Sequence, residues 1–159
     1  MNNRITYQNL QQVKTVSKPW GQEKWIQPGD ALGLHSYVLK EIILNPGFRT
    51  SIQVHQYKAE TNYILEGTGV LMYSEEFFDC QRHAAGGYTE QEIADIIANL
   101  KSQSYAPGSV MTIEPGTVHR MIATDQLRFV EASTCHLDDV IRLQDDSNRT
   151  HGRIDTEHK

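Results

Sequence analysis

Several side chains that can bind a metal ion or accept protons lie close together between residues 51 and 60. Ser51, Gln53 and His55 alternate with β-branched residues. Because alternate side chains of a β-strand share one face, the polar three face the same way. A polar face turned into a protein interior costs free energy unless something satisfies it. A metal ion does so, because imidazole nitrogen with amide or carboxylate oxygen suits Zn²⁺, Mn²⁺ or Fe²⁺.

Glu60 follows His55 after a short turn and can return its carboxylate to the same face. A second stretch ends in Pro115-Gly116, a turn that places His119 at the start of a strand. We therefore predict one metal site with positions open for water or substrate. Its four ligands would be Gln53, His55, Glu60 and His119. The alternatives are that both histidines are ordinary polar residues, that Glu60 only forms an ion pair, and that Gln53 faces inward without touching the metal.

Short β-rich runs bounded by glycine, proline and asparagine surround these residues. The runs cover residues 36–44, 50–55, 62–65, 70–73, 109–113, 119–123 and 127–132. Many short strands with regular turn signals predict an all-β barrel or sandwich.

The segment 89–101 is the exception and predicts one amphipathic helix inserted between strands. Thr89 and Glu92 form a capping-box pattern. Four apolar residues then recur at helical spacing: Ile93, Ile96, Ile97 and Leu100. This stripe predicts packing against the barrel wall, with a lid hinged near Gly86-Gly87 or a subunit contact as alternatives.

Length and charge limit the classes of function. The chain has 159 residues, 38% of them hydrophobic and 22% charged, which is typical of one globular domain. The net charge of −5 gives no electrostatic support to nucleic-acid or membrane binding. The two cysteines form no CxxC pair, and we see neither a signal peptide nor an apolar stretch long enough for a bilayer. These features predict a cytoplasmic protein with reduced thiols.

Both metal-site stretches resemble the cupin pattern, which reads G-x5-H-x-H-x4-E-x6-G and then G-x5-P-x-G-x2-H. The first half is matched by Gly47, Gln53, His55, Glu60 and Gly67, with Gln53 in place of the first histidine. The second half is matched by Gly108, Gly116 and His119, with Glu114 where proline is usual. The resemblance implies a double-stranded β-helix (jelly-roll) barrel that holds one divalent metal, Zn or else Mn, Fe or Ni.

The glutamine points to a narrower resemblance, to phosphomannose isomerases and above all to the C-terminal cupin of type II mannose-6-phosphate isomerases. It is carried by Lys18-Pro19-Trp20-Gly21, residues 40–47, Lys58-Ala59-Glu60, residues 129–131 and residues 138–143. We read residues 1–159 as a single cupin domain with an N-terminal arm (1–17), an insert (74–104) and a flexible C-terminal tail (146–159). Tyr57, Asn62 and the insert depart from the family, so the substrate stays open.

This resemblance implies an aldose–ketose isomerase that acts on a sugar or sugar phosphate through an enediolate. The candidate bases are Lys40, Lys58 and Glu131, besides a metal-bound hydroxide, and Arg142 would hold substrate oxygens or a phosphate. Candidate substrate contacts are Ser51, Asn62 and Trp20, although a core anchor is the favoured alternative for Trp20.

Two other functions stay open, a non-catalytic carbohydrate-binding or regulatory cupin and an Fe-dependent oxygenase. We expect a homodimer, because the N-terminal arm can add to the sheet edge of a second copy. The remaining histidines are expected to be incidental surface residues, and Asp138-Asp139 to be a solvated turn.

Overall fold

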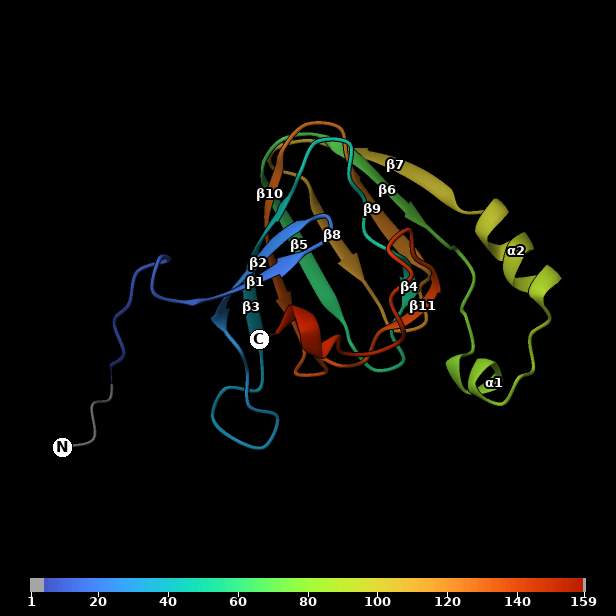
Figure 1. Ribbon diagram of the computed structural model, residues 1–159, viewed down its shortest axis with the longest axis horizontal. Coiled ribbons are helices and arrows are strands. Elements are labelled where there is room, and N and C mark those ends of the chain that lie inside the picture. Colours follow the sequence, from blue (N-terminus) through green and yellow to red (C-terminus); the bar gives the residue numbers. More distant parts are fainter. Residues whose placement is uncertain (1–4, 159) are drawn as a thin grey trace.

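The computed structural model describes residues 5–158, which form two antiparallel sheets that face each other as a barrel (Figure 1). The six-stranded sheet has the order β1-β2-β3-β10-β5-β8. Its strands are β1 (Lys14–Lys18), β2 (Gly21–Gln27), β3 (Val38–Leu44), β10 (Leu127–Ser133), β5 (Glu60–Glu66) and β8 (Val110–Ile113). The five-stranded sheet consists of β11 (Ile141–Gln144), β4 (Ile52–Val54), β9 (His119–Ala123), β6 (Gly69–Tyr73) and β7 (Lys101–Tyr105). The all-β prediction is confirmed.

Strand alternation divides the apolar residues between two cores. Between the sheets, Ile42, Leu44, Ile64, Leu127 and Phe129 are among the residues that form the larger buried cluster. Ile52 and Val54 of β4 belong instead to a second cluster, while Gln53 between them lines the interior pocket. The polar face of β4 is therefore the inner one, as its sequence predicts.

The insert contains more structure than the single predicted helix. The predicted helix is α2 (Glu90–Ala98), and it begins with the Thr89–Glu92 capping box. It ends before residue 101, because residues 101–105 pair with β6 as the edge strand β7. A second helix, α1 (Cys80–Ala84), is capped by Asp79 and has too few residues for an apolar period to reveal it. One helix over 89–101 was thus an incomplete description.

Helix α2 covers the barrel wall. Its apolar stripe packs against the cluster of Ile52, Val54, Phe78 and Val118, on the outer side of the five-stranded sheet. Figure 1 shows both helices outside the barrel, at the right of the view. The prediction that the stripe packs on the wall is confirmed, and the lid alternative is not supported.

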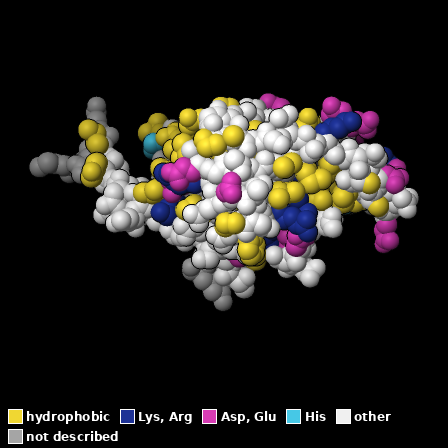
Figure 2. All heavy atoms as spheres, turned by 90° about the horizontal axis from the view of Figure 1, so that it is seen from above, with side chains coloured by type: hydrophobic (Ala, Val, Ile, Leu, Met, Phe, Trp, Pro, Cys, Tyr) yellow, Lys and Arg dark blue, Asp and Glu magenta, His cyan; other side chains and the backbone are white. Residues whose placement is uncertain are grey.

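The two ends of the chain behave differently. The described arm residues before β1 extend away from the barrel, at the left of Figures 1 and 2. The C-terminal residues turn back toward the barrel through a 3₁₀ turn at Asp155–Glu157, where Glu157 pairs with Lys18 of β1 at 2.9 Å. Among the described residues we find no helix with the length and apolar character that a membrane crossing requires.

Candidate metal centre

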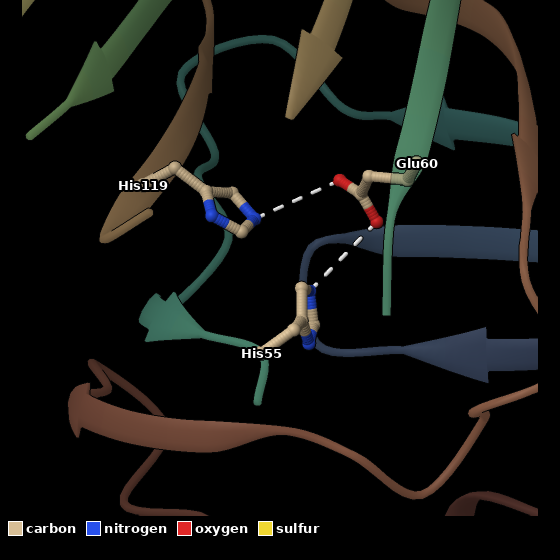
Figure 3. Close-up of side chains that lie close together, drawn as sticks. All are labelled: His55, Glu60 and His119. Carbon is tan, nitrogen blue, oxygen red and sulfur yellow. Dashed lines mark ion pairs between the residues drawn. The ribbon is translucent and has the colours of Figure 1, made fainter. Parts of the chain in front are cut away.

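Three buried side chains converge on one point inside the barrel (Figure 3). His55 Nε2 lies 3.8 Å from one carboxylate oxygen of Glu60, and His119 Nε2 lies 3.6 Å from the other. The three candidate ligand atoms lie within 4.8 Å of one another. Ligand atoms bound at about 2 Å from one ion are separated by a little over 3 Å, so a small inward adjustment would suffice to bind a metal.

Strand ends and turns fix these positions. Glu60 begins β5, His119 begins β9, and His55 directly follows β4. Gln53 and His119 are paired across β4 and β9, which brings the two predicted halves of the site together. Gly116 has φ of 80°, a left-handed backbone conformation that favours glycine in the turn that leads to His119.

The hydrogen bonds of both histidines leave a lone pair for a cation. Nδ1 of His119 donates to the Thr117 carbonyl at 2.9 Å, and Nδ1 of His55 donates to the Asp139 carbonyl. In this tautomer each Nε2 presents its lone pair toward the Glu60 carboxylate. His55 Nε2 is buried and has no hydrogen-bond partner within the described chain. The two Nε2 lone pairs and the Glu60 carboxylate repel one another unless a cation lies among them. These three residues therefore fit a metal ion.

Charge and burial also keep His55 neutral. Burial lowers the pKa of His55 to about 4, helped by the neighbouring Lys58 ammonium. A neutral imidazole is the form that binds a metal, so the site is ready to bind at neutral pH.

Gln53 lies beside this cluster, but its amide is turned so that the nitrogen faces inward. Gln53 Nε2 lies 3.5 Å from His119 Nε2, while Gln53 Oε1 accepts a 2.8 Å hydrogen bond from Ser51. An amide binds a metal through its oxygen, so coordination by Gln53 would require the amide to rotate. Metal binding by Gln53 stays a prediction, and Ser51 contacts Gln53 without lining the pocket.

A buried ion cluster adjoins the candidate ligands. Lys58 donates to Glu60 at 2.5 Å and to Glu131 at 3.0 Å. Burial opposes the charge on Lys58, but Glu131 and Glu60 outweigh it and raise the Lys58 pKa. Burial also works against the Glu60 carboxylate, but the Lys58 ammonium outweighs it and lowers the Glu60 pKa. For Glu131 burial prevails, aided by repulsion from Glu60, and its pKa is raised although Lys58 opposes this.

Strand register aligns further predicted residues in one row. Glu131 of β10 is paired with Lys40 of β3 on one side and with Asn62 of β5 on the other. Asn62 donates to Glu60 at 3.3 Å, and its buried Oδ1 has no partner among the described residues. Lys40 donates to Glu23 at 3.1 Å and lies 4.9 Å above the Trp25 ring.

These side chains line a cavity of about 100 Å³, and the three candidate metal ligands are part of its wall. Trp20 serves both the core and the cavity wall. Arg142 also lines the cavity, where its Nη1 donates to the backbone carbonyls of Thr150 and Gly152 and its Nε has no partner in the described structure. Of the predicted residues only Ser51 lies off the cavity wall; their roles toward a substrate remain predictions.

The sequence reasoning missed several residues that shape the site. Asp139, expected in a solvated turn, accepts backbone hydrogen bonds from Gln56, Tyr57 and Lys58 and so holds the turn between His55 and Glu60. His158, expected on the surface, lines the cavity and contacts the Trp25 ring edge-on at 5.3 Å between ring centroids. The sequence identified Lys18 only as part of the Lys-Pro-Trp-Gly motif. No motif or spacing indicated that Glu23 or Arg149 would belong to the site. Their places depend on chain segments far apart in sequence.

Comparison with known proteins places the chain in a family. Residues 5–129 match the family described as Mannose-6-phosphate isomerase C-terminal, and the chain belongs to that family. A mannose-1-phosphate guanylyltransferase from Salmonella muenchen is 26% identical over 123 residues. That match covers 77% of this chain but only 24% of the enzyme, so the chain spans about a quarter of its length. The resemblance drawn from the sequence motifs is thereby confirmed.

Solved structures agree on the fold. The ectoine synthase of P. lautus superposes with a TM-score of 0.59 at 12% identity, covering 82% of this chain and 78% of that one. The capsular polysaccharide assembling protein CapF of Staphylococcus aureus gives 0.58 at 13% identity, with 89% and 33% covered. The polyketide cyclase RemF of Streptomyces resistomycificus gives 0.56 at 18% identity, with 89% and 85% covered. At such identities the likeness shows the cupin fold alone.

Proposed function

We propose that this protein is a metal-dependent isomerase that interconverts an aldose and a ketose, with a sugar phosphate as its substrate class. The observation that carries the proposal is a buried carboxyl group with a raised pKa, Glu131, in the same cavity as the His55–Glu60–His119 cluster. The family to which the chain belongs supports the sugar-phosphate class. A bound divalent metal would polarise the substrate's carbonyl and hydroxyl oxygens.

The chain's own groups supply the proton transfer. The Glu131 carboxylate would take the proton from the carbon next to the carbonyl and return it to the former carbonyl carbon. The hydroxyl proton would pass from one substrate oxygen to the other within the enediolate, so that no proton is consumed. A base is most effective when its pKa lies near the working pH, and burial moves Glu131 in that direction. The Lys58 ammonium, 3.0 Å from Glu131, would stabilise the negative charge of the enediolate.

Other predicted residues would position the sugar. Asn62 Oδ1 is buried without a described partner and can accept a hydrogen bond from a substrate hydroxyl. Arg142 would hold substrate oxygens or the phosphate, while Lys40, fixed by Glu23 and Trp25, would be a positioning group.

Hydrogen–deuterium exchange tests the proposal. The metal-loaded protein, incubated in D₂O with a panel of aldoses, ketoses and their phosphates, should introduce deuterium at C1 or C2 of one of them, as measured by NMR. Glu131→Gln should reduce this exchange at least about 100-fold, as expected for a lost general base. Glu66→Gln is the matched control, because Glu66 lies on the neighbouring strand β5 with a largely exposed side chain. Binding without exchange would replace the isomerase by a carbohydrate-binding module, and metal-dependent O₂ consumption would replace it by an oxygenase.

We also propose that the protein forms a homodimer through its N-terminal arm. Ile5 and Tyr7 are 81% and 92% exposed on a segment that leaves the barrel. Apolar side chains on an extended arm are stabilised when they pack on a second copy. Sedimentation should show a dimer for the full chain and a monomer for a variant lacking residues 1–12; a monomeric full chain would contradict the proposal.

A further inference from the structure

The cavity is rich in cations. We call the part lined by Lys18, Arg149 and part of the segment 152–158 its outer end, and the part lined by His55, Glu60 and His119 its inner end. Six lysine and arginine side chains line the cavity but only three carboxylates do, although the whole chain has a net charge of −5. The cationic lining residues are Lys18, Lys40, Lys58, Arg142, Arg149 and Arg153. Lys40 and Lys58 are held by Glu23, Glu60 and Glu131, which are themselves the lining carboxylates. The remaining cations lie toward the C-terminal segment.

One carboxylate of that segment bridges two of the outer cations. Glu157 lies 2.9 Å from the Lys18 ammonium and 3.4 Å from the Arg149 guanidinium. The Lys18 and Arg149 side chains are each 9% exposed, and that of Glu157 is 11% exposed. Lys18 and Arg149 line the cavity while Glu157 does not, so Glu157 contacts them from the segment beside it. Glu23 also lies 3.9 Å from Lys18, and Asp145 pairs with Arg149 at 2.8 Å.

The same segment narrows the cavity. Gly152, Arg153, Ile154 and His158 all contribute to its lining. The enclosed volume of about 100 Å³ is well below the roughly 300–1,000 Å³ of small-molecule pockets. A sugar phosphate therefore needs more room than this volume offers, and an outward movement of the C-terminal segment would supply it.

We propose that Lys18 and Arg149 form a binding site for the phosphate group of the substrate, and that Glu157 occupies this site as an internal competitor. Entry of a phosphate would replace the Glu157 carboxylate on both cations and release residues 153–158 from the cavity. A phosphate suits this exchange because it carries more charge than a carboxylate and offers three acceptor oxygens to the same two donors. The phosphate specificity rests on the proposed function, whereas the occupancy of the cation pair by Glu157 does not.

The C-terminal segment is joined to the barrel by contacts suited to such an exchange. Besides Glu157, they include the edge contact of His158 with Trp25 and a hydrogen bond from the Gly152 N–H to the Val140 carbonyl. Arg149 itself is anchored independently by Asp145, with contacts at 2.8 and 2.9 Å. Departure of residues 153–158 would therefore leave the cation pair in place.

Titration of the metal-loaded protein with inorganic phosphate, followed by calorimetry, tests the proposal. Glu157→Gln should bind phosphate about tenfold more tightly than the unmodified chain, because the competing charge is removed. Glu90→Gln is the control: it removes the same charge from an exposed side chain of helix α2, which lies outside the barrel. Glu90→Gln should change the affinity less than twofold. Equal gains from the two variants, or no gain from Glu157→Gln, would overturn the proposal.

A second variant separates the local site from a general charge effect or from phosphate bound at the metal. Adding Lys18→Met to Glu157→Gln should reverse the gain, since the proposed site then lacks its ammonium group. Retention of the gain would show that phosphate binds elsewhere and would overturn the proposal. Hydrogen exchange should also quicken at residues 153–158 when phosphate is bound, and unchanged exchange there would contradict the release of the segment.

Failure of the proposed phosphate site can be told apart from failure of the proposed isomerase activity. Tighter phosphate binding by Glu157→Gln without deuterium exchange on any sugar would remove the isomerase and keep the anion site. Deuterium exchange that is equal in the unmodified chain and in Glu157→Gln at every concentration of sugar phosphate would keep the isomerase and remove the competitor.

Discussion

Both ends of the cavity contain charged side chains but hold them in different ways. At the inner end, His55, Glu60, His119, Lys58 and Glu131 come from or next to strands that pair across the barrel. At the outer end, Lys18 is satisfied by Glu157 of a segment that follows the last strand. Ladder hydrogen bonds fix the inner charges, whereas few contacts fix the outer carboxylate. The inner end is therefore suited to hold a metal and move a proton, and the outer end to exchange one anion for another.

The largest effect is expected where a buried ion cluster loses its only ammonium group. Lys58→Met would leave Glu60 and Glu131 buried without their shared partner, and we expect the metal-free protein to lose about 3–5 kcal/mol of unfolding free energy. Urea denaturation measures this loss. Lys24→Met is the control, because its ammonium lies 3.9 Å from Glu41 nearer the surface, and it should cost less than about 1 kcal/mol. Similar losses for both would remove the contrast between fixed and loosely held charges.

The metal ligands come next. His119→Ala should weaken binding of Zn²⁺ by about 100- to 1,000-fold, since structural zinc sites share about 10–16 kcal/mol among four ligands. Competition with a chromogenic chelator gives the affinity. His136→Ala, at an exposed histidine, should leave it unchanged. Stoichiometric zinc of unchanged affinity in His119→Ala would place the metal elsewhere and would separate the inner end from its proposed role.

Glu23 contacts both Lys40 and Lys18, so the pH dependence of stability shows how firmly it is held. Burial would raise its pKa, but Lys40 and Lys18 outweigh burial and lower it to about 2. The pKa of Glu23 in the folded protein lies below the ordinary glutamate pKa of 4.5, which also applies to the unfolded chain. The stability that results is therefore present above pH 4.5 and is lost as the pH falls toward 2. The full contribution is about 3 kcal/mol, of which about 2 kcal/mol should be gone at pH 3.

The measurement is the difference in unfolding free energy between the unmodified chain and Glu23→Gln at pH 6 and pH 3. A difference that shrinks with falling pH agrees with a carboxylate held by both lysines. A difference independent of pH would mean that Glu23 stabilises the fold through the packing of its side chain and not through its charge.

The smallest effect is expected at the outer end. Removing residues 153–159 should lower the unfolding free energy by less than about 2 kcal/mol, because Lys18 and Arg149 lose Glu157 but keep Glu23 and Asp145 as partners and become accessible to water. Thermal denaturation measures this change. A loss as large as that of Lys58→Met would show that the C-terminal segment is part of the folded core and cannot leave the cavity.

The metal cluster was predictable because its signals are local. Strand alternation around Gln53 orients His55, and the Pro115-Gly116 turn positions His119. The row of Lys40, Glu131 and Asn62 was predictable only as a set of candidates, since strand register decides which residues face each other. Asp139 and Glu157 were not predictable as site residues, because Asp139 binds Tyr57, 82 positions away, and Glu157 reaches Lys18, 139 positions away.

By itself the sequence determined the all-β barrel, the family and the candidate ligands, because turn residues and side-chain alternation act over a few positions and repeat in a recognisable pattern. Only the tertiary structure decided that the insert covers the wall and that the C-terminal segment returns to the cavity. It also decided that Lys58 joins two carboxylates and that Lys18 and Arg149 share a third. Such pairings depend on which surfaces meet when the sheets close. The spacing of residues along the chain does not show which side chains will then lie close together.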